Sequence, residues 1–476
     1  MIRLKNMLHL AFVICLFLGV GASARAFTTS NSTTAWQSYK QQFFYVINGN
    51  EGYFRNQQGV GYTTTTYQLA YDIEAAVDAQ DVTVVNQTIN GFVALYGTNP
   101  ASWDVAEDDN MTFALVFAAA YQLTGNANHL AMAKSNFDTC YNRAWDPVNG
   151  GLVRIAGGVK SAQVNGPGCL AAYLIYQSGG GSAYLTIAQN IYNWMLANVW
   201  NSSTGQVNAT PGDTSNPLSS DASYFAACSH YLGYPGNVTL AGNFVKNRWG
   251  TGMQGFGPGS FLGSVNSINL RWLAKSGFDI PFLQACCDRG LTCMNASGLV
   301  GPDFNQPTSN AAAYSFDCTN IVAGLMCVPP SNGPSPGAYA VYVRSTGLAL
   351  DANGAGTANG TALTQSGYHA GSNQKWNLNY LGNGQYSMIG VGSGRAVEVN
   401  GYSQNNNATV DIWDYIGAGN QKFTLVDQGS RYYNIAFVHS GKAMQVLNNS
   451  TAWGAAVVQY TLGSNGYNAQ WKFQAP

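Results

Sequence analysis

Charged side chains are scarce in this sequence. Of its 476 residues only 9% are Asp, Glu, Lys or Arg, and the 21 basic residues nearly balance the 22 acidic ones. The basic residues form no patch or stripe, so nucleic acid is excluded as a partner. The surface must instead be polar through Asn, Gln, Ser, Thr, Gly and Tyr, a composition found in extracellular proteins.

Long apolar runs are missing once the first 26 residues are passed. No later stretch has 18 unbroken apolar residues, so no membrane span is expected there. At the start, two basic residues precede the apolar run from Leu8 to Val20, and Ala24 and Ala26 are small residues at the positions that a signal peptidase reads. We therefore expect residues 1–26 to be a signal peptide, with an uncleaved anchor as the alternative. The mature protein is then secreted, extracellular or in the cell wall.

Cysteine is absent after Cys327. Of nine cysteines, Cys15 falls in the predicted signal peptide, and the other eight lie between Cys140 and Cys327. An even number in an exported chain predicts structural disulfides, whose connectivity stays open. No cysteine pair has zinc-ligand spacing with histidine partners, so we predict neither a metal site nor a cofactor. We also expect a glycoprotein, because the chain carries many Asn-x-Ser/Thr sequons, among them Asn31, Asn86, Asn201, Asn208, Asn237, Asn295, Asn359, Asn407 and Asn449.

The sequence divides at a proline-rich connector, residues 328–336. Helical periodicity dominates before the connector, and short strand-like runs with Gly and Asn turns dominate after it. A chain of this length is expected to form two domains. We predict an all-α domain at residues 27–327 and an all-β domain at residues 337–476.

The C-terminal part repeats three times with a spacing of 47 residues. The units open at Gly347, Gly394 and Gly441, and they end in Asn-Gln-Lys-Trp, Asn-Gln-Lys-Phe and Asn-Ala-Gln-Trp. Three regular units of short alternating strands do not predict a solenoid. Over residues 337–476 the sequence resembles the ricin B-type lectin β-trefoil with its Gln-x-Trp repeats. The resemblance implies a carbohydrate-binding domain.

Sugar contact needs an exposed aromatic face and nearby amide and carboxylate groups. The ring positions Trp376, Phe423 and Trp471 are expected to fill the core instead. The resemblance maps a complete pocket onto the second repeat: Glu398, Asp411, Trp413, Asn420 and Gln421. The first repeat offers Asp351, Asn373 and Gln374, but it has Ser366 at the aromatic position, with Tyr368 two residues on. The third offers Gln445, Tyr460 and Asn468, with Ala469 in place of the glutamine.

The N-terminal part repeats more faintly, with a spacing of 55 residues. Tyr121, Gly125 and Trp145 recur as Tyr176, Gly180 and Trp200, and apolar residues within a unit follow helical spacing. One unit is then a helical hairpin followed by a glycine-rich loop, and about six such hairpins fit the length. This pattern predicts an α/α toroid, with an open helical array as the alternative.

Acidic residues cluster at one loop of this part. Asp104, Glu107, Asp108 and Asp109 lie within six residues of an acid-poor chain. Like charges packed in a cleft raise the pKa of one of them, as a paired general acid and nucleophile require. The alternative is capping of the helix that follows.

The acid pair also lies in a longer pattern. Asp108-Asp109-Asn110 is followed by a helix that ends in Tyr-Gln-Leu-Thr-Gly, and then by Ala133-Lys134, Phe137-Asp138, Trp145-Asp146, Gly150-Gly151-Leu152 and the segment 160–165. Over residues 30–325 this pattern resembles glycoside hydrolase family 76, the endo-α-1,6-mannanases. The resemblance implies an (α/α)6 fold and retention of anomeric configuration. It implies Asp108 as nucleophile, Asp109 as general acid/base, and substrate contacts at Trp103 and Asn165.

The sequence departs from the family at the expected subsite aromatics: Met111, Thr112 and Phe113 follow the acid pair, and Val153 and Arg154 follow Gly-Gly-Leu. We predict a secreted glycosidase acting on α-1,6-mannan or a related α-mannoside polysaccharide, and held on its substrate by the lectin domain. The alternatives are a lectin whose helical domain has weak or no activity, and a cell-wall transglycosidase. We expect a monomer whose partner is the polysaccharide, with no nucleic acid and no membrane.

Overall fold

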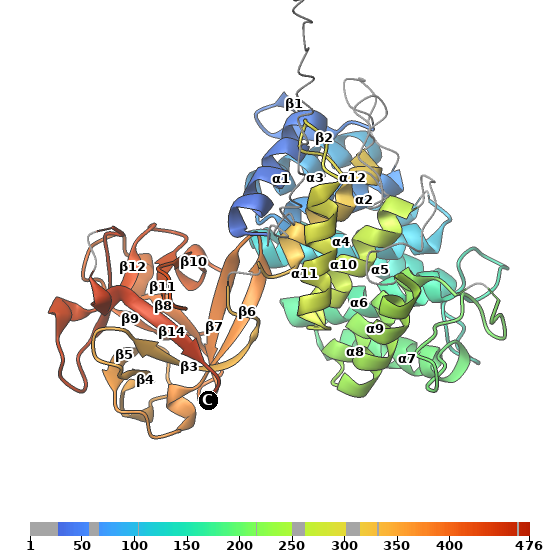
Figure 1. Cartoon of the computed structure of the whole chain (residues 1–476). Coiled ribbons are helices and arrows are strands. Elements are labelled where there is room, and N and C mark those ends of the chain that lie inside the picture. The colour runs from blue at the N-terminus through green and yellow to red at the C-terminus, as the bar shows by residue number, and fades with distance from the viewer. Residues whose placement is uncertain are drawn as a thin grey trace, which may run out of the picture.

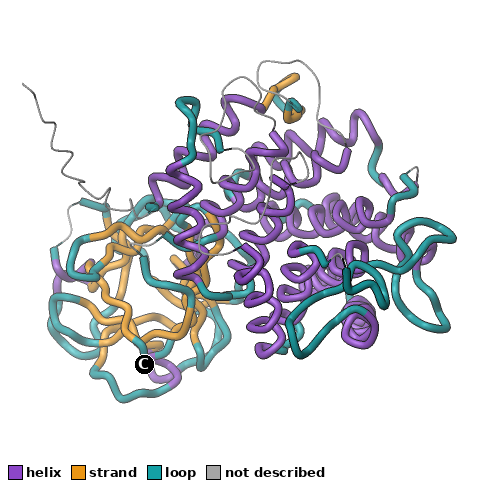
Figure 2. The backbone as a smooth tube through the Cα atoms, turned by 45° about the vertical axis from the view of Figure 1, so that its right-hand side comes forward, coloured by secondary structure: helices purple, strands orange, loops and turns teal. Residues whose placement is uncertain are grey.

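The computed structural model describes residues 27–56, 66–102, 104–215, 217–249, 262–300, 315–330, 333–463 and 466–476. Within this part a helical lobe is followed by a lobe of strands, as Figures 1 and 2 show. The predicted signal peptide lies outside the described residues. No described helix is both long and apolar enough to cross a membrane.

The helical lobe is a closed double ring. Each even-numbered helix packs against the even-numbered helices on either side of it, and α12 returns to α2. These inner helices are α2 (Thr66–Asp78), α4 (Glu107–Thr124), α6 (Ala162–Ile175), α8 (Ser219–Tyr231), α10 (Leu262–Lys275) and α12 (Ser315–Cys327). The predicted toroid is therefore confirmed, and an open array is not.

The odd-numbered helices form the outer ring and pack on the inner ones. They are α1 (Thr29–Phe43), α3 (Val82–Tyr96), α5 (Ala127–Ala144), α7 (Ser182–Asn198), α9 (Pro235–Trp249) and α11 (Ile280–Thr292). A small hairpin of β1 (Phe44–Asn48) and β2 (Glu51–Phe54) packs on α3. The inner helices are covered on all sides, and in α4 every residue from Asn110 to Ala118 is buried. That explains why the sequence showed amphipathic spacing mainly in outer helices such as α5.

The 55-residue repeat corresponds to successive hairpins. α4 ends at Gly125, whose φ of +66° favours glycine. The loops after α5 and α7 each begin with a tryptophan that forms a bridge to the far side of its loop, Trp145 with Leu152 and Trp200 with Val207. A Cβ on Gly151 would lie 2.4 Å from the Trp194 ring, so the loop closes tightly onto α7.

The interior also holds a buried ion cluster. The guanidinium of Arg271 on α10 bonds to Glu74 and Asp78 on α2, and Lys275 donates to Asp78 at 2.7 Å. Burial raises the pKa of Glu74, although Arg271 opposes that shift. Breaking such a pair leaves an uncompensated buried charge, so the cluster fixes two inner helices relative to each other.

The predicted disulfide framework is not borne out for six of the cysteines, which are buried thiols in the described part of the chain: Cys140, Cys169, Cys228, Cys286, Cys287 and Cys327. They pack as small apolar side chains, and burial raises the pKa of Cys286 to about 12. Cys169 and Cys228 instead donate to backbone carbonyls of Ala188 and Gly166. The even number of cysteines in the sequence therefore did not indicate disulfides for these residues.

The second lobe is a β-trefoil. Six of its strands pair in a closed circuit, β3–β14–β11–β10–β7–β6 and back to β3. They are β3 (Gly337–Val343), β6 (Trp376–Gly382), β7 (Gln385–Gly390), β10 (Phe423–Asp427), β11 (Tyr433–Phe437) and β14 (Gln470–Gln474). Trp376, Phe423 and Trp471 are buried at its centre, as predicted.

The other six strands form three lateral hairpins, one for each repeat. They are β4 (Ala349–Ala352) with β5 (Thr361–Ser366), β8 (Ala396–Val399) with β9 (Val410–Trp413), and β12 (Ala443–Val446) with β13 (Val457–Tyr460). Their registers are equivalent, because Ala349, Ala396 and Ala443 lie opposite Ser366, Trp413 and Tyr460. The 47-residue period is therefore the period of the trefoil.

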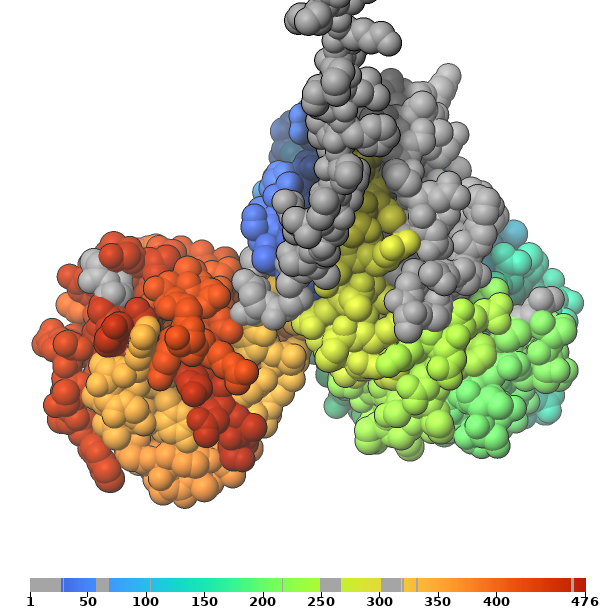
Figure 3. Space-filling model, in the orientation of Figure 1, coloured from blue at the N-terminus to red at the C-terminus, as the bar shows by residue number. Residues whose placement is uncertain are grey.

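The two lobes meet at a built interface, and Figure 3 shows them as separate bodies that touch along one strip. The turn of the β6–β7 hairpin enters the helical lobe, where the Asn383 amide donates to Met326 O at 2.9 Å and its side chain donates to Ala79 O at 3.0 Å. Gln80 donates to Leu381 O at 3.1 Å and accepts from Lys422 at 3.2 Å. The trefoil is therefore held to the helical lobe by direct contacts as well as by the connector.

Candidate active site and sugar-binding pockets

Three acidic residues open the inner helix α4. Glu107, Asp108 and Asp109 occupy its first turn, where the free N–H groups and the helix dipole favour negative charge. Asp104 shapes the entry, because its Oδ1 accepts from the backbone N–H of Ala106 at 2.8 Å. The helix start therefore holds the acid cluster at one end of the inner ring.

Glu107 has a structural role and not a catalytic one. It is buried, and both of its carboxylate oxygens accept from the guanidinium of Arg143. Asn110 adds a bond of 3.3 Å to Oε2. The charge of Glu107 is thus neutralised and both of its carboxylate oxygens have partners. Asp108 and Asp109 remain as the candidate catalytic residues.

Asp108 lies against a cation. Nε of Arg154 donates to Asp108 Oδ2 at 2.7 Å. The carbonyl of Arg154 also accepts from the Glu107 N–H at 2.9 Å, so the loop after α5 is tied to the head of α4 by backbone and side chain. The other oxygen, Asp108 Oδ1, is buried without a partner among the described residues.

Asp109 has a strongly perturbed acidity. Burial, the negative charge of Asp108 and that of Asp104 raise its pKa to about 7, while Arg154 pulls it down. A carboxyl with this pKa is about half protonated at neutral pH, so it can act as a general acid and, once ionised, as a general base. The sequence analysis predicted a raised pKa for one carboxyl of the acidic cluster, and Asp109 is that carboxyl.

Asp221 is a third carboxyl that sequence reasoning missed. It lies in the first turn of α8, is 3% exposed, and its Oδ2 is a buried atom without a partner among the described residues. Burial and the charge of Asp108 raise its pKa to about 8. The signal available in the sequence was a Ser-Ser-Asp triplet at the start of a predicted helix in an acid-poor chain.

Tyr71 on α2 belongs to the same neighbourhood. Burial raises its pKa, and the charges of Glu74, Asp109 and Asp108 raise it further, which places the phenol close to the acid pair. Together with Asp108 on α4 and Asp221 on α8, three inner helices supply polar groups at this end of the ring. The site is therefore assembled across the toroid and not from one loop.

Two predicted substrate contacts fare differently. Asn165 is 0% exposed, and its amide is used by the backbone: it donates to Leu152 O at 3.0 Å and Ser161 O at 2.8 Å, and accepts from Leu152 N at 2.9 Å. This geometry makes Asn165 a support for the Gly-Gly-Leu loop and does not favour direct substrate contact. Trp103 lies outside the described residues.

An open groove is lined in part by Arg143, the partner of Glu107, but by neither Asp108 nor Asp109. It is formed by the loops after α5 and α7, which lie on the side of the helical lobe away from the trefoil in Figure 2. Its polar wall includes Arg143 and the ion pair of Lys160 with Asp146, at 2.6 Å. Val153, the neighbour of Arg154, lies in the same wall.

The second trefoil repeat brings its predicted residues together. Glu398 and Asp411 face each other across β8 and β9, and Gln421 donates to Glu398 Oε2 at 2.8 Å. Asn420 donates to Val399 O at 2.9 Å, so its amide is partly used by the backbone. Burial raises the pKa of both carboxyls, and the Trp413 ring beside them is 40% exposed. Carboxylate, amide and aromatic face thus occur in one pocket.

The first repeat keeps the polar half of this pocket. Asn373 donates to Asp351 Oδ2 at 3.0 Å, and His369 Nε2 lies 3.9 Å from the same oxygen. The Gln374 amide donates to Gly367 O at 2.8 Å. In the third repeat Asn468 donates to Val446 O at 2.9 Å, and Gln445 replaces the acid.

Comparison with known proteins agrees with this division. Residues 22–222 match the profile of glycosyl hydrolase family 76, and residues 330–413 and 419–476 match the ricin-type beta-trefoil lectin domain-like profile. A search of curated protein sequences gave no match.

Two solved structures share the helical fold. The GH76A alpha-1,6-mannanase from Salegentibacter sp. HEL1_6 is 15% identical, with a TM-score of 0.55 over 62% of this chain and 97% of that chain. The family 76 (mannosidase) Bt3792 from Bacteroides thetaiotaomicron is 15% identical, with a TM-score of 0.52 over 62% and 96%. The designed three-fold symmetric protein ThreeFoil is 40% identical over 29% of this chain and 99% of that chain, with a TM-score of 0.29.

Proposed function

We propose that this chain, which joins a helical domain of glycoside hydrolase family 76 to a ricin-type β-trefoil lectin domain, is a secreted glycosidase that cleaves α-1,6-mannan or a related α-mannoside polysaccharide. The single observation that carries the proposal is the unequal pair at the head of α4. Asp108 is paired with a guanidinium, while its neighbour Asp109 has a pKa raised to about 7.

The pair fits a retaining double displacement. Asp109 protonates the glycosidic oxygen of the leaving sugar while a carboxylate oxygen of Asp108 attacks the anomeric carbon, which forms a glycosyl-enzyme. Asp109, now ionised, then takes a proton from water, and the hydroxide oxygen displaces Asp108 from the anomeric carbon. The two inversions together retain configuration, and the proton returns to Asp109.

Arg154 and Asp221 have supporting roles in this scheme. Arg154 holds Asp108 in one orientation and balances its charge. Asp221, with a pKa raised to about 8, is a neutral acid at pH 7 that can donate to a sugar hydroxyl in the cleft. A neutral donor is useful beside a carboxylate nucleophile because it adds no further negative charge.

We expect the cleft to bind neutral sugar chains that need few stacking contacts with aromatic side chains. At the positions that follow Gly-Gly-Leu the chain has Val153 and Arg154. The groove beside Val153 is lined by apolar as well as polar side chains, among them Trp145, Pro147 and Lys160. We propose that hydroxyl contacts along this groove, together with the trefoil, replace part of the grip that aromatic subsites would provide.

The test is product analysis with α-1,6-mannan labelled at the reducing end. Internal cleavage should release shortened oligosaccharides, and proton NMR should detect the α-anomer of the new reducing ends first. Products longer than the substrate would instead identify a transglycosidase. Absence of any reaction in the parent protein, with unimpaired binding by the trefoil, would leave a lectin with an inactive helical domain and contradict the proposal.

A further inference from the structure

The ring of inner helices closes where its last member, α12, packs against its first, α2. Every other pair of neighbouring inner helices is joined along the chain through a single outer helix, whereas α2 and α12 stand near the two ends of the domain sequence. We call the contact between α2 and α12 the seam. Its closure depends on packing and on groups that bond to both helices.

One residue of the trefoil bonds to both helices of the seam. The backbone N–H of Asn383 donates to Met326 O, in the last turn of α12, at 2.9 Å, and its side-chain amide donates to Ala79 O, directly after α2, at 3.0 Å. The last carbonyls of a helix have no partner within the helix, so they need donors from elsewhere. Asn383 therefore caps two helices of the other domain at once.

The end of α2 has a second tie to the trefoil. The N–H groups of Gln80 and Asp81 turn back to Val77 O and Ala76 O, at 2.9 and 3.1 Å, and this turn holds Gln80 at a φ of +57°. Glycine is the residue that favours this position after a helix, because a side chain is strained there. The glutamine instead reaches across the interface, where it donates to Leu381 O. A strained residue at the helix end thus provides a bond between the domains.

The turn that carries Asn383 is shaped to enter the seam. Gly382, Asn383 and Gly384 all have positive φ, at +105°, +46° and +72°. A Cβ on Gly382 would lie 2.3 Å from Asp78 O and 3.1 Å from Met326 O, so only glycine fits between the two helices. In Figure 1 the β6–β7 hairpin lies on the side of the trefoil that faces the helical lobe.

The same turn recurs one 47-residue period later without a docking role. Residues 429–431 also have three positive φ values, +74°, +55° and +64°, and they are exposed. The shape of the turn therefore belongs to the trefoil, and the insertion between two helices is particular to the first repeat. Ser430, which corresponds to Asn383, provides a matched control position.

The helix that the trefoil caps also borders the candidate active site. Arg271 on α10 bonds to Glu74 and Asp78, which holds α2 along its length. Tyr71, earlier in the same helix, has its phenol close to the acid pair. Any loosening of the seam would therefore displace one wall of the site.

We propose that the lectin domain stabilises the closed ring by bridging its seam through Asn383 and Gln80. The trefoil is then a structural part of the helical domain as well as a binding module. Release of the β6–β7 turn loosens α2 and α12 before the other inner helices. This inference is independent of the proposed reaction and of the sugar that the trefoil binds.

The experiment is amide hydrogen exchange, measured by mass spectrometry on the full chain. Asn383→Gly removes the side-chain bond and tolerates the positive φ. Peptides from α2 and α12 should exchange about fivefold faster, the change expected for the loss of one net hydrogen bond. Peptides from α6 and α8 should be unchanged. Ser430→Gly, the control, should leave the whole helical lobe unchanged.

Gln80→Gly is a second variant with an opposite expectation from local structure alone. Glycine relieves the strain after α2, so an unassisted helix end would exchange more slowly. The proposal expects faster exchange in α2, because the bonds to the trefoil are lost. Unchanged exchange of the seam helices in Asn383→Gly, an equal effect in Ser430→Gly, or slower exchange of α2 in Gln80→Gly overturns it.

Discussion

Nε of Arg154 and Oδ2 of Asp108 are joined by a hydrogen bond of 2.7 Å, and the carbonyl of the same arginine accepts from the helix that carries the aspartate. A charged bond of this length fixes orientation as well as charge. The residue that departs from the family pattern thus lies against the proposed nucleophile.

Asp108→Asn should abolish mannan cleavage, because an amide cannot form the glycosyl-enzyme. Glu107→Gln is the matched control on the same helical turn, since Glu107 is buried and neutralised by Arg143. It should lower stability more than it lowers kcat. Reducing-sugar release and thermal unfolding measure the two effects. Near-normal cleavage by Asp108→Asn would contradict the assignment and redirect attention to Asp104.

Asp109→Asn should also be severely impaired on mannan, because the leaving oxygen then has no proton donor. Azide should restore turnover on an aryl mannoside with a good leaving group, because the first step then needs no acid and azide replaces water in the second. Identification of the mannosyl azide and its anomeric configuration is the measurement. No rescue by azide, with binding unchanged, would argue against an acid/base role.

The pH profile of kcat/KM should fall on its alkaline side near pH 7, where Asp109 loses its proton. Arg154 lowers the pKa of Asp109, so Arg154→Gln should move this fall to higher pH while reducing kcat. Arg154→Lys should keep the fall nearer to that of the parent because a positive charge is retained. An alkaline limb that does not move in Arg154→Gln would show that another group sets it.

Stability should also respond to pH through Asp221. Its folded pKa is about 8, above the ordinary aspartate value of 3.8, so the folded state holds the proton more tightly than the unfolded state. The free energy of unfolding from this group is therefore greatest below pH 4 and declines as pH rises toward 8. Asp221→Asn removes the titration and should flatten the decline of the melting temperature over that range. An equally steep decline in the variant would contradict the assignment.

In the trefoil, Trp376→Ala and Trp413→Ala should separate folding from binding. Trp376 is buried and donates to Leu350 O, so its loss should cost about 3–5 kcal/mol of stability. Trp413 is 40% exposed, and its loss should weaken carbohydrate binding while leaving the melting temperature nearly unchanged. Denaturant unfolding and mannan binding distinguish the two. Undiminished binding by Trp413→Ala would remove the second-repeat site.

Proteolysis within residues 328–336 should nick the connector without releasing the lobes, because the β6–β7 turn remains docked. A Cβ on Gly382 would lie 2.3 Å from Asp78 O, so Gly382→Ala should let the nicked halves separate in gel filtration. Gly429→Ala is the matched control, one 47-residue period later, also at positive φ but with open space around it. Separation of the nicked parent would show that the interface is too weak to hold.

The sequence predicted the periodic features well. The 47-residue and 55-residue repeats correspond to trefoil units and helical hairpins, and the rings of Trp376 and Trp471 lie where repeat position predicted them. Asp221 was missed because a single acid at a helix start looks like a cap, and only tertiary packing places it near Asp108.

The docking of the trefoil has a consequence for how the two domains would meet a polysaccharide. Its contacts are with the C-terminal ends of inner helices, at Ala79 after α2 and Met326 in α12, and a Cβ on Gly417 would lie 3.3 Å from Gln122 O near the end of α4. Asp108 and Asp109 lie at the opposite end of α4, whose 18 residues span roughly 27 Å.

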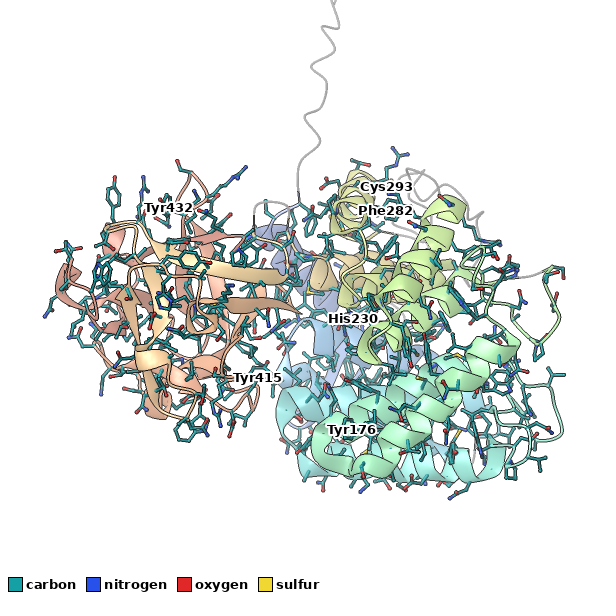
Figure 4. All side chains as sticks on the ribbon, turned by 90° about the horizontal axis from the view of Figure 1, so that it is seen from below. Tyr176, His230, Phe282, Cys293, Tyr415 and Tyr432 are labelled. Atoms are coloured by element: carbon teal, nitrogen blue, oxygen red, sulfur yellow. The ribbon has the colours of Figure 1, made fainter. Side chains whose placement is uncertain are left out.

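Figure 4 shows Tyr415, near that contact, on the side of the trefoil that faces the helical lobe. The trefoil and the proposed catalytic pair are thus held at opposite ends of the inner helices. A glycosidase bound to polysaccharide through its trefoil would therefore cleave neighbouring polysaccharide chains. It would leave uncut the chain to which the trefoil is bound.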